Sequence, residues 1–138
     1  MSTVIEQALQ ARLVASAPRM DVVPVVLRYD PADPFAVRMA FPAPATLEGV
    51  EAEWAFSRDL LAAGADAPAG VGDVRIRPYG HDRTVVEFHA VEGVAVVHVR
   101  TSEVRRFLRR TRQVVPSGCE YLFLDLDRDL AHLLRDAR

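Results

Sequence analysis

The chain has 138 residues, half of them hydrophobic, so we expect a single domain over residues 1–138 with a core of its own. The formal net charge is −2, whereas proteins that bind nucleic acid through bulk electrostatics are usually much more basic. No stretch approaches the roughly 20 apolar residues of a membrane span, and no signal peptide is expected. The sequence therefore predicts a cytoplasmic protein that reaches a membrane only indirectly.

Residues 3–15 fit two patterns. Thr3 and Glu6 can form a capping box, and Leu9 and Leu13 continue a four-residue repeat that begins at Ile5, which indicates a helix. Alternate residues also share one face of a strand, and a turn follows at residues 16–18. The members of that face are Ile5, Gln7, Leu9, Ala11 and Leu13. The local pattern favours a helix slightly and leaves a strand open.

The next segments predict antiparallel strands. Valine-rich residues 22–29 and residues 35–41 form a hairpin around residues 30–34, where two prolines and two aspartates favour a turn. A loop over residues 42–49 leads to a strand over residues 50–56. On that strand, one face is apolar and is expected in the core: Val50, Ala52, Trp54 and Phe56.

A short helix is predicted over residues 57–64, with Ser57 as N-cap and Gly64 as its stop. A loop at residues 66–72 precedes further strands. Those strands are expected at residues 73–77, 84–90 and 94–100, with Glu92-Gly93 as a two-residue hairpin turn.

Two helices are expected at the C-terminal end. The first runs from a capping Thr101 to Gln113, ends before Pro116, and carries an apolar stripe. The stripe consists of Val104, Phe107, Leu108 and Thr111. A short extended piece at residues 121–124 leads to the last helix, on which Leu126, Leu130, Leu133 and Leu134 share a face. Seven mostly antiparallel strands with segregated helices predict an α+β fold.

Several segments in a fixed order resemble the SsgA-like protein family. They are residues 27–37 (LRYDPADPFAV), 54–64 (WAFSRDLLAAG), 72–75 (GDVR), 107–111 (FLRRT), 115–118 (VPSG) and 125–127 (DLD) with Leu130. Together they span almost the whole chain. On these segments the chain is identified as a member of the family, and the resemblance favours a strand over residues 3–15.

The resemblance also implies a function. SsgA-like proteins act in sporulation-linked cell division of actinobacteria, and their roles include placing the tubulin-like protein FtsZ at future septa. The implied protein is a non-catalytic adaptor at the septum that binds FtsZ or other SsgA-like proteins. The implied fold is Whirly-like and arranged as a homotrimer, which leaves a single-stranded nucleic-acid-binding module as the alternative function.

No group of residues indicates catalysis or a bound cofactor. The only cysteine, Cys119, lacks an adjacent histidine and is expected to be a small, partly buried thiol. Gly70-Val-Gly72 lacks the following helix that a phosphate-binding loop needs. Capping and compensation of the helix dipole account for the acids that begin the last helix. These acids are Asp125, Asp127 and Asp129.

One hairpin face gathers polar residues that resemble metal ligands. With Glu92-Gly93 as the turn, Glu87 lies opposite His98 and His89 opposite Val96, so Glu87, His89 and His98 share a face. Two histidines and a carboxylate can hold zinc. A cross-strand charge pair on a polar face explains the same pattern, and no metal site is predicted.

The helix over residues 101–113 is strongly basic on its polar side. Its arginines, with the one that precedes it, are Arg100, Arg105, Arg106, Arg109, Arg110 and Arg112, and Glu103 is the only acid on this helix. We assign partner binding to Arg105, Arg106, Arg109 and Arg110, with a solvated face as the alternative. Acidic protein tails, phospholipid head groups and single-stranded nucleic acid are the candidate partners. The chain contains no lysine, and Whirly-type nucleic-acid binders use a lysine-containing motif, so nucleic acid is the least favoured of the three.

Overall fold

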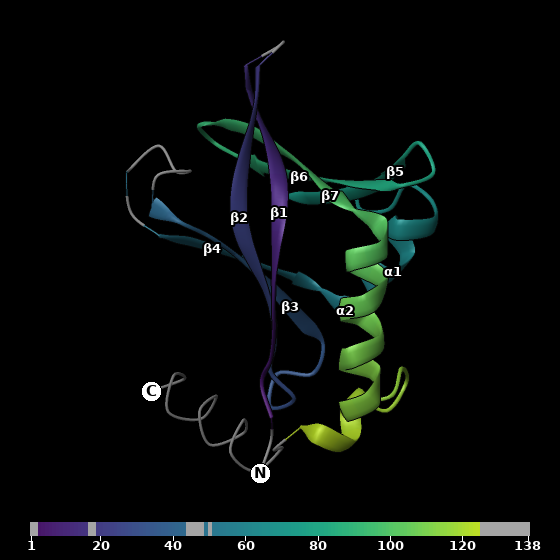
Figure 1. Ribbon diagram of the computed structural model, residues 1–138. Coiled ribbons are helices and arrows are strands. Elements are labelled where there is room, and N and C mark those ends of the chain that lie inside the picture. Colours follow the sequence, from purple (N-terminus) through teal and green to yellow (C-terminus); the bar gives the residue numbers. More distant parts are fainter. Residues whose placement is uncertain (1–2, 17–18, 44–48, 50, 125–138) are drawn as a thin grey trace.

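The computed structural model describes residues 3–16, 19–43, 49 and 51–124. They form a seven-stranded antiparallel sheet with the strand order β4-β3-β2-β1-β7-β6-β5, and two α-helices (Figure 1). The strands are β1 Ile5–Ser16, β2 Arg19–Tyr29, β3 Ala36–Phe41, β4 Ala52–Ser57, β5 Val74–Tyr79, β6 Arg83–Ala90 and β7 Gly93–Arg100. Helix α1 is Arg58–Asp66 and α2 is Thr101–Val114. The predicted α+β class and the mostly antiparallel sheet are confirmed.

The N-terminal segment is a strand, as the family resemblance favours. It lies at the centre of the sheet, paired with β2 along its length and with β7 near its end. Ile5, Leu9 and Ala11 are buried on one face, so the two-residue period prevails over the helical one. The polar Gln7 shares that face, and its side-chain amide donates to the backbone oxygen of Glu103 in α2 at 2.9 Å. This hydrogen bond satisfies a polar group inside the core.

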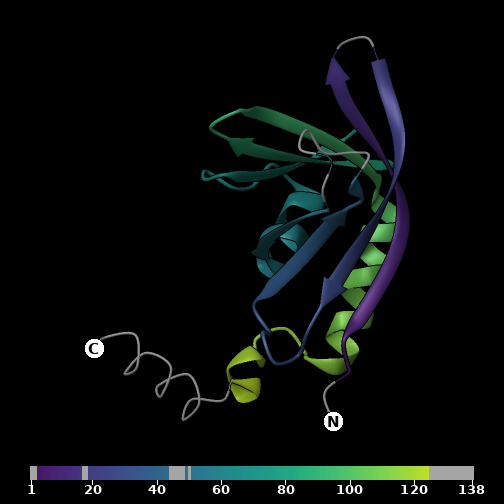
Figure 2. The same cartoon turned by 90° about the vertical axis from the view of Figure 1, so that its left-hand side faces the viewer.

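The sheet curls so that its two halves face each other across the core, as Figure 2 shows. Phe88 of β6 lies at the contact between the two halves of the sheet. Its ring lies 5.6 Å from that of Phe41 on β3, and 5.0 and 6.1 Å from those of Trp54 and Phe56 on β4. The core position predicted for Phe56 is confirmed, and Trp54 is half-buried against the same cluster.

Helix α1 begins as predicted and ends later than predicted. The Ser57 hydroxyl accepts a hydrogen bond from the backbone N–H of Leu60 at 3.1 Å, which confirms the N-cap. Gly64, however, lies inside the helix and not at its stop. A Cβ atom at this position would lie 2.4 Å from the Cβ of Ile76, so the glycine lets α1 approach β5 closely. Gly64 is therefore explained by the packing of α1 on β5 and not by the end of the helix.

Helix α2 has the predicted apolar stripe, since Val104, Phe107, Leu108 and Thr111 are all buried. Its N-cap is Arg100 and not Thr101, and no side chain caps it. The Thr101 hydroxyl instead shares a 2.9 Å hydrogen bond with the hydroxyl of Thr84 in β6. Thr101 therefore serves the contact between α2 and the sheet and does not cap the helix. A local capping pattern cannot predict this contact, because Thr84 lies on a distant strand.

After α2 the chain turns at Pro116 and forms a 3₁₀ helix, Glu120–Phe123, where the sequence predicts an extended piece. The backbone N–H of Cys119 donates to the oxygen of Pro116, and that of Leu122 to the oxygen of Cys119, which tightens the segment into a helical turn. The predicted last helix, with its leucines and with Asp125, Asp127 and Asp129, lies outside the described residues. Within the part of the chain that the structure describes, neither α-helix has the length and apolar character needed to cross a bilayer.

Candidate functional site

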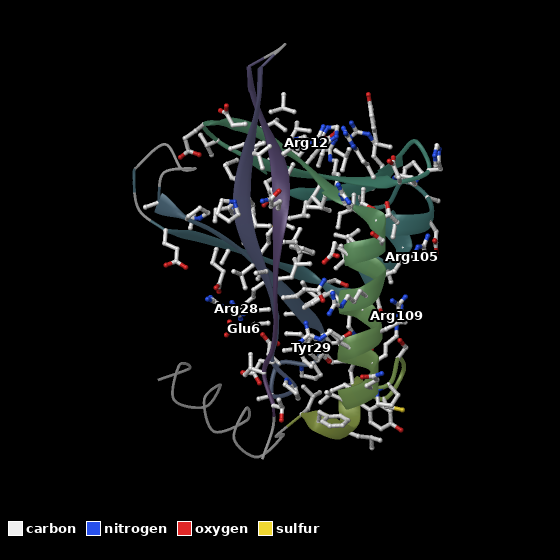
Figure 3. All side chains as sticks on the ribbon, viewed as in Figure 1. Glu6, Arg12, Arg28, Tyr29, Arg105 and Arg109 are labelled. Carbon is white, nitrogen blue, oxygen red and sulfur yellow. The ribbon has the colours of Figure 1, made fainter. Side chains whose placement is uncertain are left out.

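The outer side of α2 carries the arginines that the sequence assigns to partner binding. Arg105, Arg106 and Arg109 are exposed and Arg110 is half-buried. Arg105 and Arg109 lie on the side of the helix that faces away from β1 (Figure 3). Because the apolar stripe is buried on the opposite side, the amphipathic pattern places this surface correctly.

The four arginines are not equally free. Arg105 makes a 3.0 Å ion pair with Asp66 at the end of α1. Arg110 donates to the backbone oxygen of Glu6 and to the side-chain oxygen of Gln7, both at 3.1 Å. These two arginines fasten α2 to its neighbours. Arg106 and Arg109 have no hydrogen bond or ion pair among the described residues.

The predicted hairpin register of β6 and β7 is wrong by two residues. The turn is Val91-Glu92, and Gly93 pairs with Ala90, so Glu87 lies opposite Val96 and His98 lies opposite Val85. A shift of two keeps each residue on its predicted face. It separates His98 from the pair that Glu87 and His89 form.

Glu87 and His89 are joined by a 3.0 Å hydrogen bond, and Glu87 also forms an ion pair with Arg77 of β5. The hydrogen bond from His89, followed by the contact with Arg77, lowers the pKa of Glu87. His98 is buried away from this pair, at 8% exposure. Within the described residues, no group of three histidine, cysteine or acidic side chains is arranged to hold a metal ion.

His98 lines a second basic region, which the sequence analysis missed. It lies opposite Arg12 of β1 in the ladder and contacts the Tyr79 ring edge-on, with ring centroids 5.0 Å apart. A cavity of about 590 Å³ opens beside it, between β1, the β6–β7 pair and the first turn of α2. Burial, and then the charges of Arg83, Arg77 and Arg12, lower the pKa of His98. These arginines are scattered along the sequence, and only strand pairing brings them together.

A buried ion pair is the other feature that the sequence analysis missed. The guanidinium of Arg58, the first residue of α1, lies 2.6 Å from a carboxylate oxygen of Glu120, with side-chain exposures of 3% and 7%. Arg58 also donates to the backbone oxygen of Val115 at 2.7 Å and lies over the Tyr29 ring. A cation in the first turn of a helix opposes the helix dipole, so the position of Arg58 was the sequence signal that could have indicated a carboxylate partner.

The charges around this pair shift the pKa values of its neighbours. The hydrogen bond from Arg58 lowers the pKa of Glu120. Burial raises the pKa of Tyr29 to about 12, although Arg58 opposes that shift, and the neutral hydroxyl donates to the oxygen of Pro34 at 2.8 Å. Cys119, one residue before Glu120, is a half-buried free thiol, which agrees with the structural role expected of it.

Sequence comparison identifies the family. The family model described as "Streptomyces sporulation and cell division protein, SsgA" matches residues 23–120. The sporulation-specific cell division protein SsgB of Streptomyces coelicolor is 40% identical over 140 residues, covering 99% of this chain and 100% of that protein. SsgB of Saccharopolyspora erythraea is 46% identical over 122 residues, covering 86% of this chain and 84% of the relative.

Solved structures agree with the sequence relatives. An SsgA-like sporulation-specific cell division protein from Thermobifida fusca matches with a TM-score of 0.81 and 30% identity, covering 95% of this chain and 96% of that one. A structure described for SsgB and longitudinal cell division during sporulation of Streptomyces coelicolor matches with a TM-score of 0.79 and 36% identity, over 89% and 97% of the two chains. The curled seven-stranded sheet with its helices is therefore shared with these proteins, and the chain belongs to the SsgA family of sporulation and cell division proteins.

Proposed function

We propose that this protein is a non-catalytic adaptor in sporulation-linked cell division, which binds FtsZ or another SsgA-like protein in the cytoplasm and holds it at the septum. The names of its relatives support the process, because they are sporulation-specific cell division proteins. The observation that carries the adaptor mechanism is the pair Arg106 and Arg109, three residues apart on the exposed side of α2 and unpaired among the described residues.

Helix α2 holds these two arginines on a rigid base. Phe107 and Leu108 are buried beneath them, and Arg105 and Arg110 fasten the helix to α1 and β1. A fixed helix loses little conformational entropy when a partner binds, which favours affinity. The surface is positive on a chain whose net charge is −2, so it suits an acidic segment of the partner.

The test is binding of purified FtsZ to the protein, measured by surface plasmon resonance at several salt concentrations. The variant Arg106→Glu with Arg109→Glu reverses both free charges, and it leaves Arg110 and its contacts with β1 intact. We expect its association rate to fall by at least about tenfold, because charge complementarity acts mainly on the on-rate. Salt should slow association of the unmodified protein in the same way.

A matched control makes the same charge change elsewhere. Arg12→Glu with Arg75→Glu replaces exposed arginines on β1 and β5. This control should bind at the unmodified rate. Equal loss in both double variants would mean that only total charge matters, and normal binding by the α2 variant would place the contact on another surface.

A further inference from the structure

The cavity beside His98 collects basic groups from three separate parts of the chain. Strand β1, the β6–β7 pair and the first turns of α2 meet there. Figure 3 shows Arg12 on the upper part of β1, with nitrogen-ended side chains gathered next to it. The ionisable residues that line the cavity are Arg12, Arg83, Arg100, Arg105, His81, His98 and Asp82. Among the described residues that line the cavity, Asp82 is the only acid.

Two of these arginines are placed against each other. Arg83 and Arg100 are directly opposite in the β6–β7 ladder, and like charges in that arrangement destabilise a sheet. Arg12, Arg83 and Arg100 have no ion pair among the described residues, whereas Arg105 is held by Asp66. The fold thus places like charges together, and the Asp82 carboxylate that shares the cavity makes no ion pair with them among the described residues.

His98 is an independent indication of a ligand site. Its side chain lines the cavity, its residue is only 8% exposed, and its Nδ1 atom is buried with no hydrogen-bond partner. A buried polar atom without a partner is costly in a folded protein. The N-terminus of the 14-residue helix α2 faces the same space through Thr101 and Ser102. The backbone N–H of Thr101 donates to the oxygen of Asp82 at 2.9 Å, and no side chain caps the helix.

We propose that this cavity binds a phosphate-bearing small molecule. Arginine forks match phosphate oxygens in geometry and charge, and a helix N-terminus without a side-chain cap adds a positive dipole end. A bound phosphate group would reduce the repulsion between Arg83 and Arg100. Its oxygens would also supply hydrogen-bond acceptors beside His98. A volume of about 590 Å³ accommodates a small organic phosphate.

This site does not depend on the proposed adaptor function, because the residues that carry the two proposals differ. Arg105 lines the cavity, but it is paired with Asp66 and is not one of the two free arginines on α2. Arg106 and Arg109 do not line the cavity, and Arg12 and Arg83 do not belong to the outer side of α2. A small ligand is favoured over a nucleic acid strand because the charges converge on one cavity in a chain with a net charge of −2.

Isothermal titration calorimetry tests the site with pyrophosphate, ATP and a single-stranded oligothymidylate as separate titrants at constant ionic strength. We expect pyrophosphate and ATP to bind, and Arg12→Gln and Arg83→Gln each to weaken binding at least about tenfold. Arg109→Gln removes the same charge from the outer side of α2 and is the matched control; its affinity should equal that of the unmodified protein.

Thermal unfolding separates a binding role from a structural one. Without ligand, Arg83→Gln should be at least as stable as the unmodified protein, because it removes a like-charge pair. With pyrophosphate, the midpoint should rise for the unmodified protein and for Arg109→Gln, and much less for Arg83→Gln. A large loss of stability in ligand-free Arg83→Gln would make the arginine structural and contradict the proposal.

Other outcomes overturn the proposal directly. They are absence of pyrophosphate and ATP binding, and equal weakening by Arg109→Gln. Binding of the oligonucleotide alone would also overturn it, and would assign the cavity to a nucleic-acid surface. Loss of FtsZ binding in the α2 variant with phosphate binding intact would separate the two functions.

Discussion

At the scale of single residues, the Arg58–Glu120 pair joins distant parts of the chain. Arg58 begins α1, whereas Glu120 follows α2, and the backbone N–H of Arg58 donates to the oxygen of Phe35 at 2.8 Å. Through its backbone and its ion pair, Arg58 therefore ties the β2–β3 turn, α1 and the 3₁₀ helix together. Replacing a buried ion pair as a whole is often neutral, but removing one partner leaves an uncompensated buried charge.

Glu120→Gln should therefore lower the free energy of unfolding by about 3–5 kcal/mol, because Arg58 keeps its charge and loses its counterion. Urea unfolding followed by circular dichroism measures the change. Asp66→Asn is the control, since it breaks the exposed ion pair with Arg105 and should cost at most about 1 kcal/mol. Similar losses in both variants would show that burial does not strengthen the Arg58–Glu120 contact.

The same carboxylate predicts a pH dependence. The pKa of Glu120 is lowered in the folded protein from its ordinary value of 4.5, so the ionised form stabilises the fold above that value. This stability is lost as the pH falls through the folded-state pKa. Unfolding free energies measured from pH 7 downward should decline below about pH 4.5, and more weakly in Glu120→Gln. The pKa of Glu87 is also lowered in the folded protein, so the unfolding free energy of Glu120→Gln should still decline somewhat in acid. Parallel curves for the two proteins would contradict the assignment.

At the scale of elements, Gly64 controls how closely α1 packs on β5. In an ordinary helix, glycine to alanine stabilises by about 1 kcal/mol. Gly64→Ala should instead destabilise the protein by about 1–3 kcal/mol, because the new methyl group would overlap Ile76, whose Cβ is 2.4 Å away. Gly72→Ala is the matched control, since nothing lies within 4 Å of its Cβ position. Thermal unfolding of both variants measures the difference, and a stabilised Gly64→Ala would show that the interface yields.

Helix α2 divides its residues into anchors and a free surface. Phe107 is fully buried, so Phe107→Ala should lower the unfolding free energy by about 3–5 kcal/mol. Arg109→Ala, on the exposed side, should change it by no more than about 0.5 kcal/mol. Chemical denaturation gives both values. A comparable loss from Arg109→Ala would give that arginine a structural role and weaken its assignment to partner binding.

At the scale of the whole molecule, the curled sheet ends in two edge strands. Within the described residues, β4 pairs only with β3, and β5 pairs with β6 while its other side meets only an isolated bridge between Ile76 and Ala69. Exposed edges are usually covered or otherwise protected. A closed homo-oligomer is one way to cover them.

We predict a homotrimer, which the family resemblance implies. Multi-angle light scattering at micromolar concentrations should give about three times the chain mass of 15.3 kDa. A trimer is a closed symmetric assembly, which is the rule among soluble oligomers. Arg106→Glu with Arg109→Glu should give the same mass, since its charges lie on the outer side of α2. A monomer across the concentration range would contradict the prediction, and dissociation of the variant alone would place the subunit interface on α2.

Local patterns in the sequence were sufficient for most of the elements. Valine-rich and alternating segments between turn residues located the strands, Ser57 marked the start of α1, and the stripe through Val104 and Phe107 placed the buried side of α2. These features depend on neighbours within a few residues, so the backbone period and local hydrogen bonds determine them. For residues 3–15 the two periods competed, and the position of β1 at the centre of the sheet resolved them.

The remaining features depend on residues that are far apart in the chain. Gly64 serves contact with β5, Thr101 bonds to Thr84, and Arg58 meets Glu120 across 62 positions. The basic cavity likewise exists only because strand pairing places Arg12 beside His98. The local sequence pattern around a residue indicates its secondary structure. The residue that its side chain contacts depends on which surfaces pack together. That packing is determined only when the sheet curls and the helices cover it.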